Sequence, residues 1–177
     1  MTSADDALAT LIAKDEIREL AMLYSRGVDR KDLELLATLY TADGVDTHGK
    51  YYQGSAEGYI RFLAESLPHF PYSGHHICNH LVSVSGDEAE GEGEVYVVAY
   101  HIIPDGKGGY VEDIQNVRYL DQYRKDDGRW KFAARNVVFD MHTVRPYPTS
   151  DGPPSGGRED MSYDVLASRL FARGPRA

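Results

Sequence analysis

The order of the predicted elements constrains this chain most, because helical patterns fill the first third and β patterns fill most of the remainder. Runs rich in Val, Ile and Tyr follow one another at His75–Ser85, Glu94–Ile103, Tyr110–Lys125 and Arg129–Met141. Turn signals at Gly86-Asp87, Pro104-Asp105-Gly106 and Asp126-Asp127-Gly128 separate these runs and predict hairpins. Helices followed by an antiparallel meander predict an α+β fold rather than a βαβ fold.

Apolar residues at helical spacing predict the N-terminal helices. One segment begins at Ser3, a second at Asp15, and a third runs from Leu33 to Tyr40. Residues 41–44 read as a turn, and residues 45–53 read as a short hairpin around His48-Gly49. Ser55 is the expected N-cap of a further helix that ends at Pro68.

The predicted sheet is long enough to bend around these helices and form a cone with an open mouth, which is a common place for a small-molecule site. Residues 1–141 are assigned to this domain, and residues 142–177 to a C-terminal arm. The arm is rich in Pro and Gly between Arg145 and Arg158, and a short helix is expected over Met161–Phe171. An arm of this kind usually frays or docks on a neighbouring subunit.

The charge balance narrows the classes of partner. The chain carries 19 Lys and Arg residues against 28 Asp and Glu residues, a formal net charge of -9. Nucleic acid and anionic membrane surfaces both attract proteins with excess basic charge, so we expect neither as a partner. With a single cysteine, Cys78, the chain has no internal disulfide, which suits a reducing compartment. No signal peptide or membrane-spanning run is expected, and these features predict a cytoplasmic location.

Several histidines lie close together in the first predicted strand. His76 and His80 share one face of a strand, and His75 points to the other face. A metal site would need further ligands from elsewhere in the chain, so no metal is predicted. His48 and His69 read as loop residues.

Asp29 and His75 form the strongest candidate for acid–base chemistry. Asp29 ends the helical part and His75 begins the long strands, and such ends converge in the pocket of a cone. A carboxylate beside an imidazole orients the ring, fixes its tautomer and raises its basicity. From these residues alone, a turn aspartate and a structural histidine are the more common outcome.

The chain also resembles a known family in three ordered motifs. Ile17-Arg-Glu-Leu20 with Tyr24-Ser-Arg-Gly-Val-Asp29-Arg resembles the first motif of SnoaL-like proteins of the NTF2-like superfamily. Gly74-His75-His76-Ile-Cys-Asn79-His is similar to the second motif, and Asp127-Gly128-Arg-Trp130-Lys-Phe132 with Arg135 resembles the closing strand. The resemblance covers roughly residues 5 to 141. It implies an NTF2-like cone, in which N-terminal helices pack on a strongly curved, mainly antiparallel sheet.

Within this family, the chain resembles a branch that holds scytalone dehydratase, bile-acid 7α-dehydratases and hexachlorocyclohexane dehydrochlorinase. This resemblance implies elimination without a cofactor, in a homo-oligomer for which a trimer is favoured over a dimer. The catalytic Asp and His of the branch fall on Asp29 and His75, and a pocket Arg of the dehydrochlorinase falls on Arg135. Tyr24 matches a Tyr of the dehydratases, which favours an oxygen-containing substrate.

The resulting hypothesis is a lyase in which His75, oriented by Asp29, removes a proton from carbon. Tyr24 would bond a substrate oxygen, and Arg135 would hold a developing anion or a leaving group. Alternatively, Arg135 pairs with Asp113 or Asp121 across the sheet. The residues expected to line the substrate site are Asn79, Tyr51 or Tyr52, and Tyr100 or His101.

The substrate is expected to be small, hydrophobic, oxygenated, and aromatic or polycyclic, because the chain has 13 tyrosines. The leaving group is expected to be water, with related C–C or C–halogen lyase steps as variants. Two other functions stay open at this point. One is an isomerase of the ketosteroid type, in which an Asp carboxylate faces the substrate. The other is a non-catalytic binding cone or a small oxygenase subunit, in which Asp29 and His75 make no contact or a face of the sheet docks a different subunit.

Overall fold

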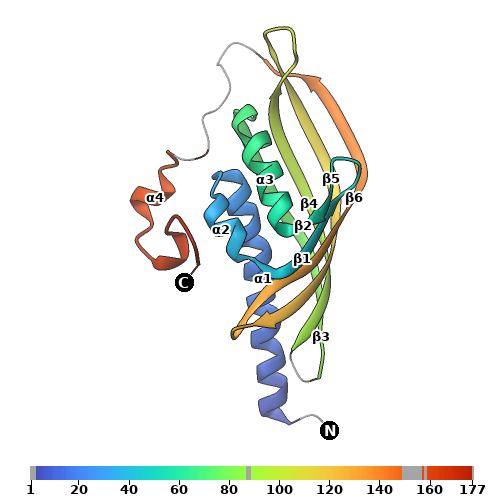
Figure 1. Cartoon of the computed structure of the whole chain (residues 1–177), viewed down its shortest axis with the longest axis vertical. Helices are drawn as coiled ribbons and strands as arrows, with labels where there is room; N and C mark the ends of the chain where they lie inside the picture. Colours follow the sequence, from blue (N-terminus) through green and yellow to red (C-terminus); the bar gives the residue numbers. More distant parts are fainter. Residues whose placement is uncertain (1–2, 87–88, 149–156, 158, 177) are drawn as a thin grey trace.

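A curved six-stranded sheet holds the helices against its concave face in a computed structural model that describes residues 3–86, 89–148, 157 and 159–176 (Figure 1). The strands are β1 (Tyr40–His48), β2 (Tyr52–Ser55), β3 (Tyr72–Val84), β4 (Glu90–Pro104), β5 (Tyr110–Asp126) and β6 (Arg129–Pro146). Their order across the sheet is β2-β1-β6-β5-β4-β3. β1 and β6 run parallel, and the other neighbours are antiparallel. The α+β prediction is therefore confirmed.

The first helix, α1 (Ala4–Asp29), is continuous, so the predicted break at Asp15 is wrong. Ser3 and Asp6 form a capping box, in which each backbone N–H donates to the other side chain at 3.0 Å. No glycine or proline interrupts the helix until Gly27 in its last turn. At Gly27 an added Cβ would lie 2.7 Å from Leu36 Cγ, so the glycine lets α2 (Leu33–Thr38) approach closely.

Residues 41–44 continue β1 instead of forming the expected turn. The register of β1 against β6 shifts between Tyr40 and Val45, which marks a β-bulge. An added Cβ at Gly44 would lie 2.9 Å from the Thr41 carbonyl oxygen, so this tight path suits glycine. The hairpin of β1 and β2 follows as predicted, and Ser55 caps α3 (Ala56–Ser66), where its Oγ accepts from Gly58 N at 3.2 Å.

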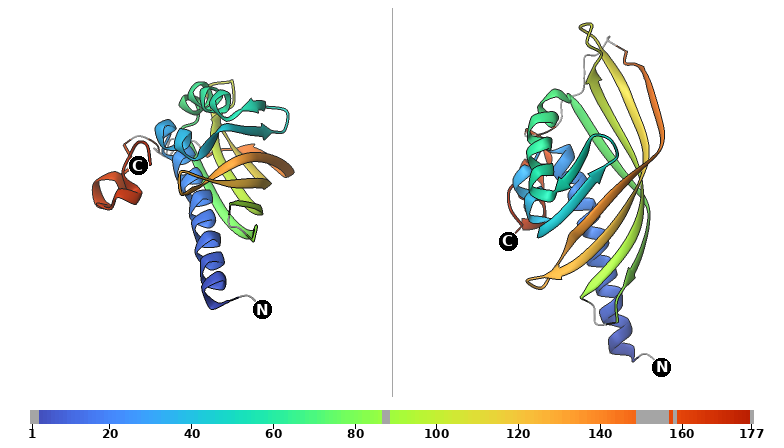
Figure 2. Two further views of the ribbon diagram at one scale, coloured as in Figure 1. Left: turned by 60° about the horizontal axis from the view of Figure 1, so that its bottom comes forward. Right: turned by 45° about the vertical axis from the view of Figure 1, so that its right-hand side comes forward.

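The four long C-terminal strands are confirmed, and their curvature produces the cone. Register shifts occur in β3 between Ile77 and His80, and in the β5–β6 pair at Asn116–Val117 and Gln122–Tyr123. Such irregularities bend strands and increase their twist. Figure 2 shows the sheet curling around α3 and the C-terminal half of α1, with the N-terminal half of α1 projecting beyond it. Of the predicted hairpin turn at Gly86-Asp87, Asp87 lies outside the described residues.

The C-terminal segment returns to the N-terminal helices. β6 continues to Pro146, past the expected strand end at Met141. The helix predicted over Met161–Phe171 is replaced by two short turns, α4 (Ser162–Val165) and the 3-10 turn η3 (Arg169–Phe171). These turns lie beside α1 and α2, away from the sheet (Figure 1). Most of the predicted irregular stretch, residues 149–156 and 158, lies outside the described residues.

Arg26 of α1 anchors this segment. Its guanidinium donates to Ser162 Oγ at 3.1 Å and to the Phe171 carbonyl oxygen at 2.9 Å. Gly174 N also donates to Asp32 Oδ2 at 3.0 Å. The described part of the segment therefore docks on its own chain. None of the helices in the described ranges is long and apolar enough to cross a membrane.

Candidate active site

A cavity of ≈ 430 Å³ lies between α1, α3 and the concave face of the sheet. Its walls are mainly apolar and aromatic, with side chains such as Phe62, Leu63, Phe70, Val117, Val137 and Phe139. Histidine, tyrosine and acid side chains interrupt these walls at three places. Such a mixture of apolar wall and few polar groups is typical of a small-molecule site.

Asp29 and His75 meet at one of the three places. Asp29 is the last residue of α1, and its Oδ1 lies 2.7 Å from His75 Nδ1. Its Oδ2 accepts from the backbone N–H of His75 at 2.9 Å, and Ser73 Oγ donates to Oδ1 at 3.0 Å. Burial favours a raised pKa for Asp29, but the bonds from His75 and Ser73 outweigh burial and lower the pKa. An ionised carboxylate only accepts, so His75 Nδ1 carries the hydrogen of this bond and Nε2 is the ring nitrogen left for other partners.

Strand alternation brings His75, and not His76, to the cavity. The His75 side chain is 8% exposed and lines the cavity, whereas His76 is exposed. Alternation would also bring Asn79 inward, but the register shift between Ile77 and His80 reverses the phase of the strand. Asn79 is exposed, and His80 Nε2 instead contacts the buried Tyr123 hydroxyl at 3.1 Å. The assignment of Asn79 to the substrate site is therefore wrong.

A second imidazole, His101 on β4, faces the cavity near His75. The centroids of the two rings lie 5.4 Å apart. The neighbouring Tyr100 points to the other face of the sheet, where its hydroxyl donates to Glu112 Oε1 at 2.6 Å. Of the predicted pair, His101 lines the cavity and Tyr100 does not.

Asp113 on β5 links His101 to a third imidazole, His142, at the second polar place. Asp113 Oδ2 lies 3.2 Å from His101 Nδ1, and Asp113 Oδ1 contacts His142 Nε2. Burial opposes ionisation, but the bonds from His101, His142 and Gln115 prevail and lower the pKa of Asp113 to about 2. Burial in turn lowers the pKa of His101. Sequence reasoning did not assign Asp113 or His142 to the site.

The third polar place is a chain of hydrogen bonds that begins at Tyr24. The Tyr24 and Tyr59 hydroxyls lie 2.8 Å apart, and Tyr59 Oη lies 3.0 Å from His48 Nε2. His48 Nδ1 lies 2.5 Å from Asp46 Oδ1, and the Tyr40 hydroxyl donates to Asp46 Oδ2 at 2.7 Å. The prediction that His48 is a loop residue is wrong, because His48 ends β1 and lines the cavity. Its alternation with Asp46 in the sequence is the signal that was overlooked.

Of the two tyrosines in the β1–β2 hairpin, Tyr51 and Tyr52, only one reaches the cavity, as alternation predicts. Tyr51 lines the cavity. Tyr52 does not, because its hydroxyl donates to the Ser55 carbonyl oxygen at 2.7 Å and its ring packs against Tyr59 and Phe62. Tyr52 is therefore a packing residue in this structure.

Arg135 lies in the core beneath the cavity and not on its surface. Its Nε and Nη2 atoms donate to the Asp121 carboxylate at 2.8 and 2.7 Å. The guanidinium lies 4.1 Å from the ring centroids of Tyr24, Tyr119 and Phe132. The predicted contact between Arg135 and the substrate is wrong, and its alternative, the pair with Asp121, is present.

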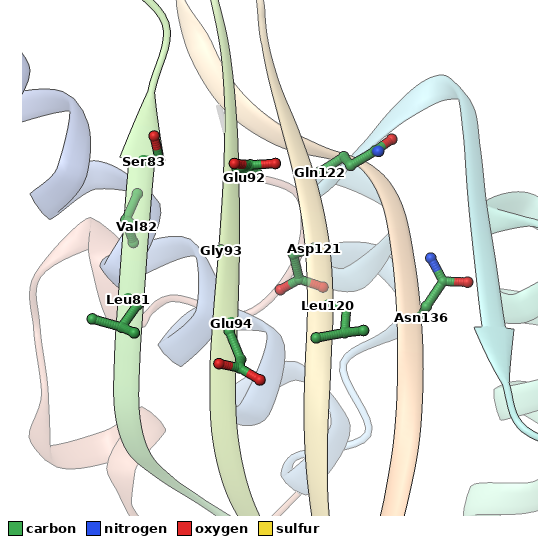
Figure 3. A pocket seen from close by; sticks show the side chains of 10 residues that line it. All are labelled: Leu81, Val82, Ser83, Glu92, Gly93, Glu94, Leu120, Asp121, Gln122 and Asn136. Carbon is green, nitrogen blue, oxygen red and sulfur yellow. The ribbon is translucent and has the colours of Figure 1, made fainter.

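A separate groove of ≈ 470 Å³ lies on the outer face of the sheet (Figure 3). Leu81, Leu120, Glu92 and Glu94 line it, with the helices behind the sheet. It is slightly larger than the inner cavity, but its lining contains neither histidine nor tyrosine. The candidate acid–base residues therefore line the inner cavity and not this groove. In the described ranges, no His, Cys, Asp and Glu side chains are grouped to hold a metal ion.

Comparisons with known proteins agree with this architecture. A family model described as a SnoaL-like domain matches residues 9–136. No curated protein matches the chain. Among solved structures, a proposed scytalone dehydratase from Novosphingobium aromaticivorans DSM 12444 is 24% identical, with a TM-score of 0.67; the match covers 89% of this chain and 97% of that chain.

Two dehydrochlorinase structures are similar to the same degree. LinA is 22% identical over 84% of this chain and 99% of its own, with a TM-score of 0.71. The hexachlorocyclohexane dehydrochlorinase LinA-type3 from Novosphingobium barchaimii LL02 is 22% identical over 86% of this chain and 100% of its own, with a TM-score of 0.68. At these identities the likeness shows the fold, which is NTF2-like, and some distant structural relatives are lyases. Because the family model matches most of the chain, this protein belongs to the SnoaL-like family.

Proposed function

We propose that this protein is a cofactor-independent lyase that eliminates water from a small, hydrophobic, oxygenated substrate, with His75 as general base. The observation that carries the proposal is the 2.7 Å contact between Asp29 Oδ1 and His75 Nδ1 at the wall of an apolar cavity. Because Nδ1 is bonded to Asp29, Nε2 is the ring nitrogen of His75 that would accept the proton.

The reaction begins when His75 Nε2 takes a proton from a carbon next to a carbonyl group. The electron pair of the broken C–H bond moves into a new bond toward the carbonyl carbon, and negative charge develops on the carbonyl oxygen. Collapse of this intermediate expels a hydroxyl group from the adjacent carbon. His75 returns its proton to that hydroxyl, which leaves as water, so the imidazole ends the cycle as it began.

The cavity wall supports a neutral substrate with an oxygen leaving group. Of the described residues that line it, none is a lysine or an arginine. A halide or carboxylate anion would therefore meet no side-chain cation apart from a protonated histidine. Rings such as Phe62, Phe70 and Phe139 favour a flat aromatic or polycyclic body.

The alternatives have less support. An isomerase of the ketosteroid type needs a carboxylate free to reach the substrate, but His75 and Ser73 occupy the two oxygens of Asp29. The form of the non-catalytic cone in which Asp29 and His75 make no contact is contrary to the 2.7 Å distance. We also propose that the protein is a cytoplasmic homo-oligomer, with a trimer favoured over a dimer, and light scattering would test its mass.

A fluorescence assay tests the proposed reaction. The probe is 3-hydroxy-1-tetralone, a bicyclic β-hydroxyketone that forms fluorescent 1-naphthol when it loses water. We expect the wild-type protein and the His76→Gln variant to accelerate this loss, and His75→Gln to abolish the acceleration. His76 is the matched control, because it is adjacent in the chain but exposed. Turnover that survives in His75→Gln would overturn the proposal. Chloride release from a chlorinated cyclohexane, measured in parallel, would point to a halide as the leaving group.

A further inference from the structure

Tyr119 of β5 is a cavity residue that takes no part in the proton abstraction described above. It lines the inner cavity and is only 2% exposed. In the described part of the chain, its hydroxyl has no hydrogen-bond partner. A buried hydroxyl without a partner is unfavourable, because it has given up its bonds to water. The Tyr119 hydroxyl is therefore available to bind a ligand in the cavity.

The other tyrosines of the cavity wall differ from Tyr119. The Tyr24 and Tyr59 hydroxyls are bonded to each other at 2.8 Å, and Tyr59 Oη also lies 3.0 Å from His48 Nε2. Tyr51 is an exposed residue of the β1–β2 hairpin, where water can satisfy its hydroxyl. Among the cavity tyrosines in the described ranges, Tyr119 thus combines burial with a free hydroxyl.

The Tyr119 hydroxyl carries its hydrogen at neutral pH. Burial raises the pKa of Tyr119 well above its ordinary value, and the negative charge of Asp29 adds to the rise. A phenol that keeps its hydrogen is a donor. This donor suits a carbonyl oxygen, which only accepts hydrogen bonds and on which negative charge develops in the proposed reaction.

The guanidinium of Arg135 strengthens this donor from beneath. It lies 4.1 Å from the centroid of the Tyr119 ring, and its charge opposes the rise in the pKa of Tyr119. A cation over the face of a phenol ring is attracted to the ring electrons and favours negative charge beside the hydroxyl. The buried Arg135 thus has an indirect electrostatic role, without contact to the substrate.

The register of the sheet places Tyr119 and His75 in a fixed order along the inner face. Tyr119 is opposite Val95 of β4, and His75 is opposite Ala99, four residues further along that strand. His101 follows two residues after Ala99. Along β4, the cavity side chains therefore follow the order Tyr119, His75, His101.

Tyr119 marks the closed end of the cavity. Its ring packs edge-on against the buried Tyr24, with the ring centroids 5.9 Å apart. At the other end, His142 contacts Asp113 and is exposed. The order of groups matches a β-hydroxyketone, in which the carbonyl group, the carbon that loses its proton and the carbon that carries the hydroxyl group follow one another.

We propose that Tyr119 donates a hydrogen bond to the carbonyl oxygen of the substrate, which enters the cavity with its carbonyl end first. The inference rests on the proposed lyase function and names the group that orients its substrate. It assigns to Tyr119 the contact with a substrate oxygen that was expected of Tyr24. As His75 removes the proton from carbon, the Tyr119 hydroxyl stabilises the negative charge on the carbonyl oxygen. Tyr119 keeps its own proton, so the balance of the reaction is unchanged.

Infrared spectroscopy of a bound ketone tests this hydrogen bond without any turnover. The probe is the bicyclic ketone 1-tetralone, measured as the difference between unlabelled and ¹³C-carbonyl samples so that the protein bands cancel. A hydrogen bond lowers the frequency of a carbonyl band. We expect a lowered band in the wild-type protein, and in Tyr119→Phe a band that returns toward its position in an apolar solvent. A band that does not move in Tyr119→Phe, or that moves only in Tyr24→Phe, would overturn the inference.

The same band separates this inference from the proposed reaction. His75→Gln removes the base but leaves the Tyr119 hydroxyl in place, so we expect the lowered band to persist in this variant. The hydrogen bond can therefore be present even where the lyase assay shows no turnover. Loss of the lowered band in His75→Gln, with the band retained in Tyr119→Phe, would contradict the role of Tyr119.

Ligand affinity gives a second readout. Tetralin lacks the carbonyl oxygen of 1-tetralone and reports on apolar contacts alone. We expect Tyr119→Phe to weaken binding of 1-tetralone roughly 2- to 12-fold, the effect of one neutral hydrogen bond, and to leave tetralin binding unchanged. Tyr100→Phe, which removes a hydroxyl on the other face of the sheet, is the control and should change neither affinity. Equal affinity of the wild-type protein and Tyr119→Phe for 1-tetralone, or no binding by the wild-type protein, would contradict the inference.

Stability in the absence of ligand tests whether the Tyr119 hydroxyl has a partner in the protein. Tyr123 is the matched comparison, because it lies on the same strand and its hydroxyl bonds to Asp121 and His80 at 3.0 and 3.1 Å. We expect Tyr119→Phe to keep or raise the urea midpoint of the wild-type protein, and Tyr123→Phe to lower it. A similar loss in both variants would show that the Tyr119 hydroxyl is already bonded and would overturn the inference.

Discussion

Arg135 and Asp121 form a fully buried ion pair, joined by two hydrogen bonds of 2.8 and 2.7 Å. Removing one partner would leave the other charge buried and uncompensated, which typically costs about 3–5 kcal/mol. We therefore expect Arg135→Met to lower the free energy of unfolding by this amount, measured by urea denaturation.

The double variant Arg135→Met/Asp121→Leu separates a structural role from a substrate contact. With both charges replaced by apolar side chains, most of the lost stability should return. A single variant that keeps full stability but loses binding of 1-tetralone would contradict the structural role of the pair.

The sequence predicts the meander, but it offers the pair of Arg135 with Asp121 only as one of two alternatives to a substrate contact. A regular hairpin at Asp127-Gly128, extended from the pair Asp126–Arg129, would bring Arg135 opposite Leu120. The register shift at Gln122–Tyr123 moves Asp121 there instead. Bulges depend on how a whole sheet packs, so alternation read from one strand does not locate them. The same reason explains why Asn79 was wrongly assigned to the cavity, because Asn79 lies within the register shift between Ile77 and His80 in β3.

Other parts of the site were predictable because they depend on local rules. The contact of His75 with Asp29 was predictable, because the end of α1 meets the start of β3 and because the family resemblance assigns both residues. His101 was a candidate from strand alternation, whereas its partner Asp113 is identified only by the observed register of the β4–β5 hairpin. His142 was missed because it lies one residue beyond the expected end of β6. The contacts of the C-terminal segment were missed because single polar bonds such as those of Arg26 leave no periodic pattern.

Asp113 should make folding stability depend on pH in acid. Its pKa is lowered from 3.8 to about 2 in the folded protein, so its ionised form favours the folded state. This contribution is fully present above pH about 4 and is lost as the pH falls toward about 2. We expect the stability difference between wild type and Asp113→Asn, measured by thermal denaturation, to shrink over that interval. A difference that stays constant between pH 5 and pH 2 would contradict the assignment.

Arg26 should control the docking of the C-terminal segment. Besides its two hydrogen bonds, its guanidinium lies 4.8 Å from the ring centroid of Tyr163. We expect Arg26→Ala to speed amide hydrogen exchange across residues 159–176, while global stability falls by no more than about 1–2 kcal/mol. Arg61→Ala, which breaks only the surface pair of Arg61 with Glu57, is the matched control. Unchanged exchange in Arg26→Ala would show that other contacts hold the segment.

Deuterium exchange into 1-tetralone tests the central claim, that His75 removes a proton from carbon next to a carbonyl group. The ketone carries such protons but no leaving group, so exchange in D₂O isolates the proton transfer from the elimination. Mass spectrometry would follow uptake with the wild-type protein, His75→Gln and the control His76→Gln. We predict accelerated uptake with the wild-type protein and His76→Gln, and uptake at the buffer rate with His75→Gln. Equal acceleration by His75→Gln, or none by the wild-type protein, would contradict the general-base role of His75.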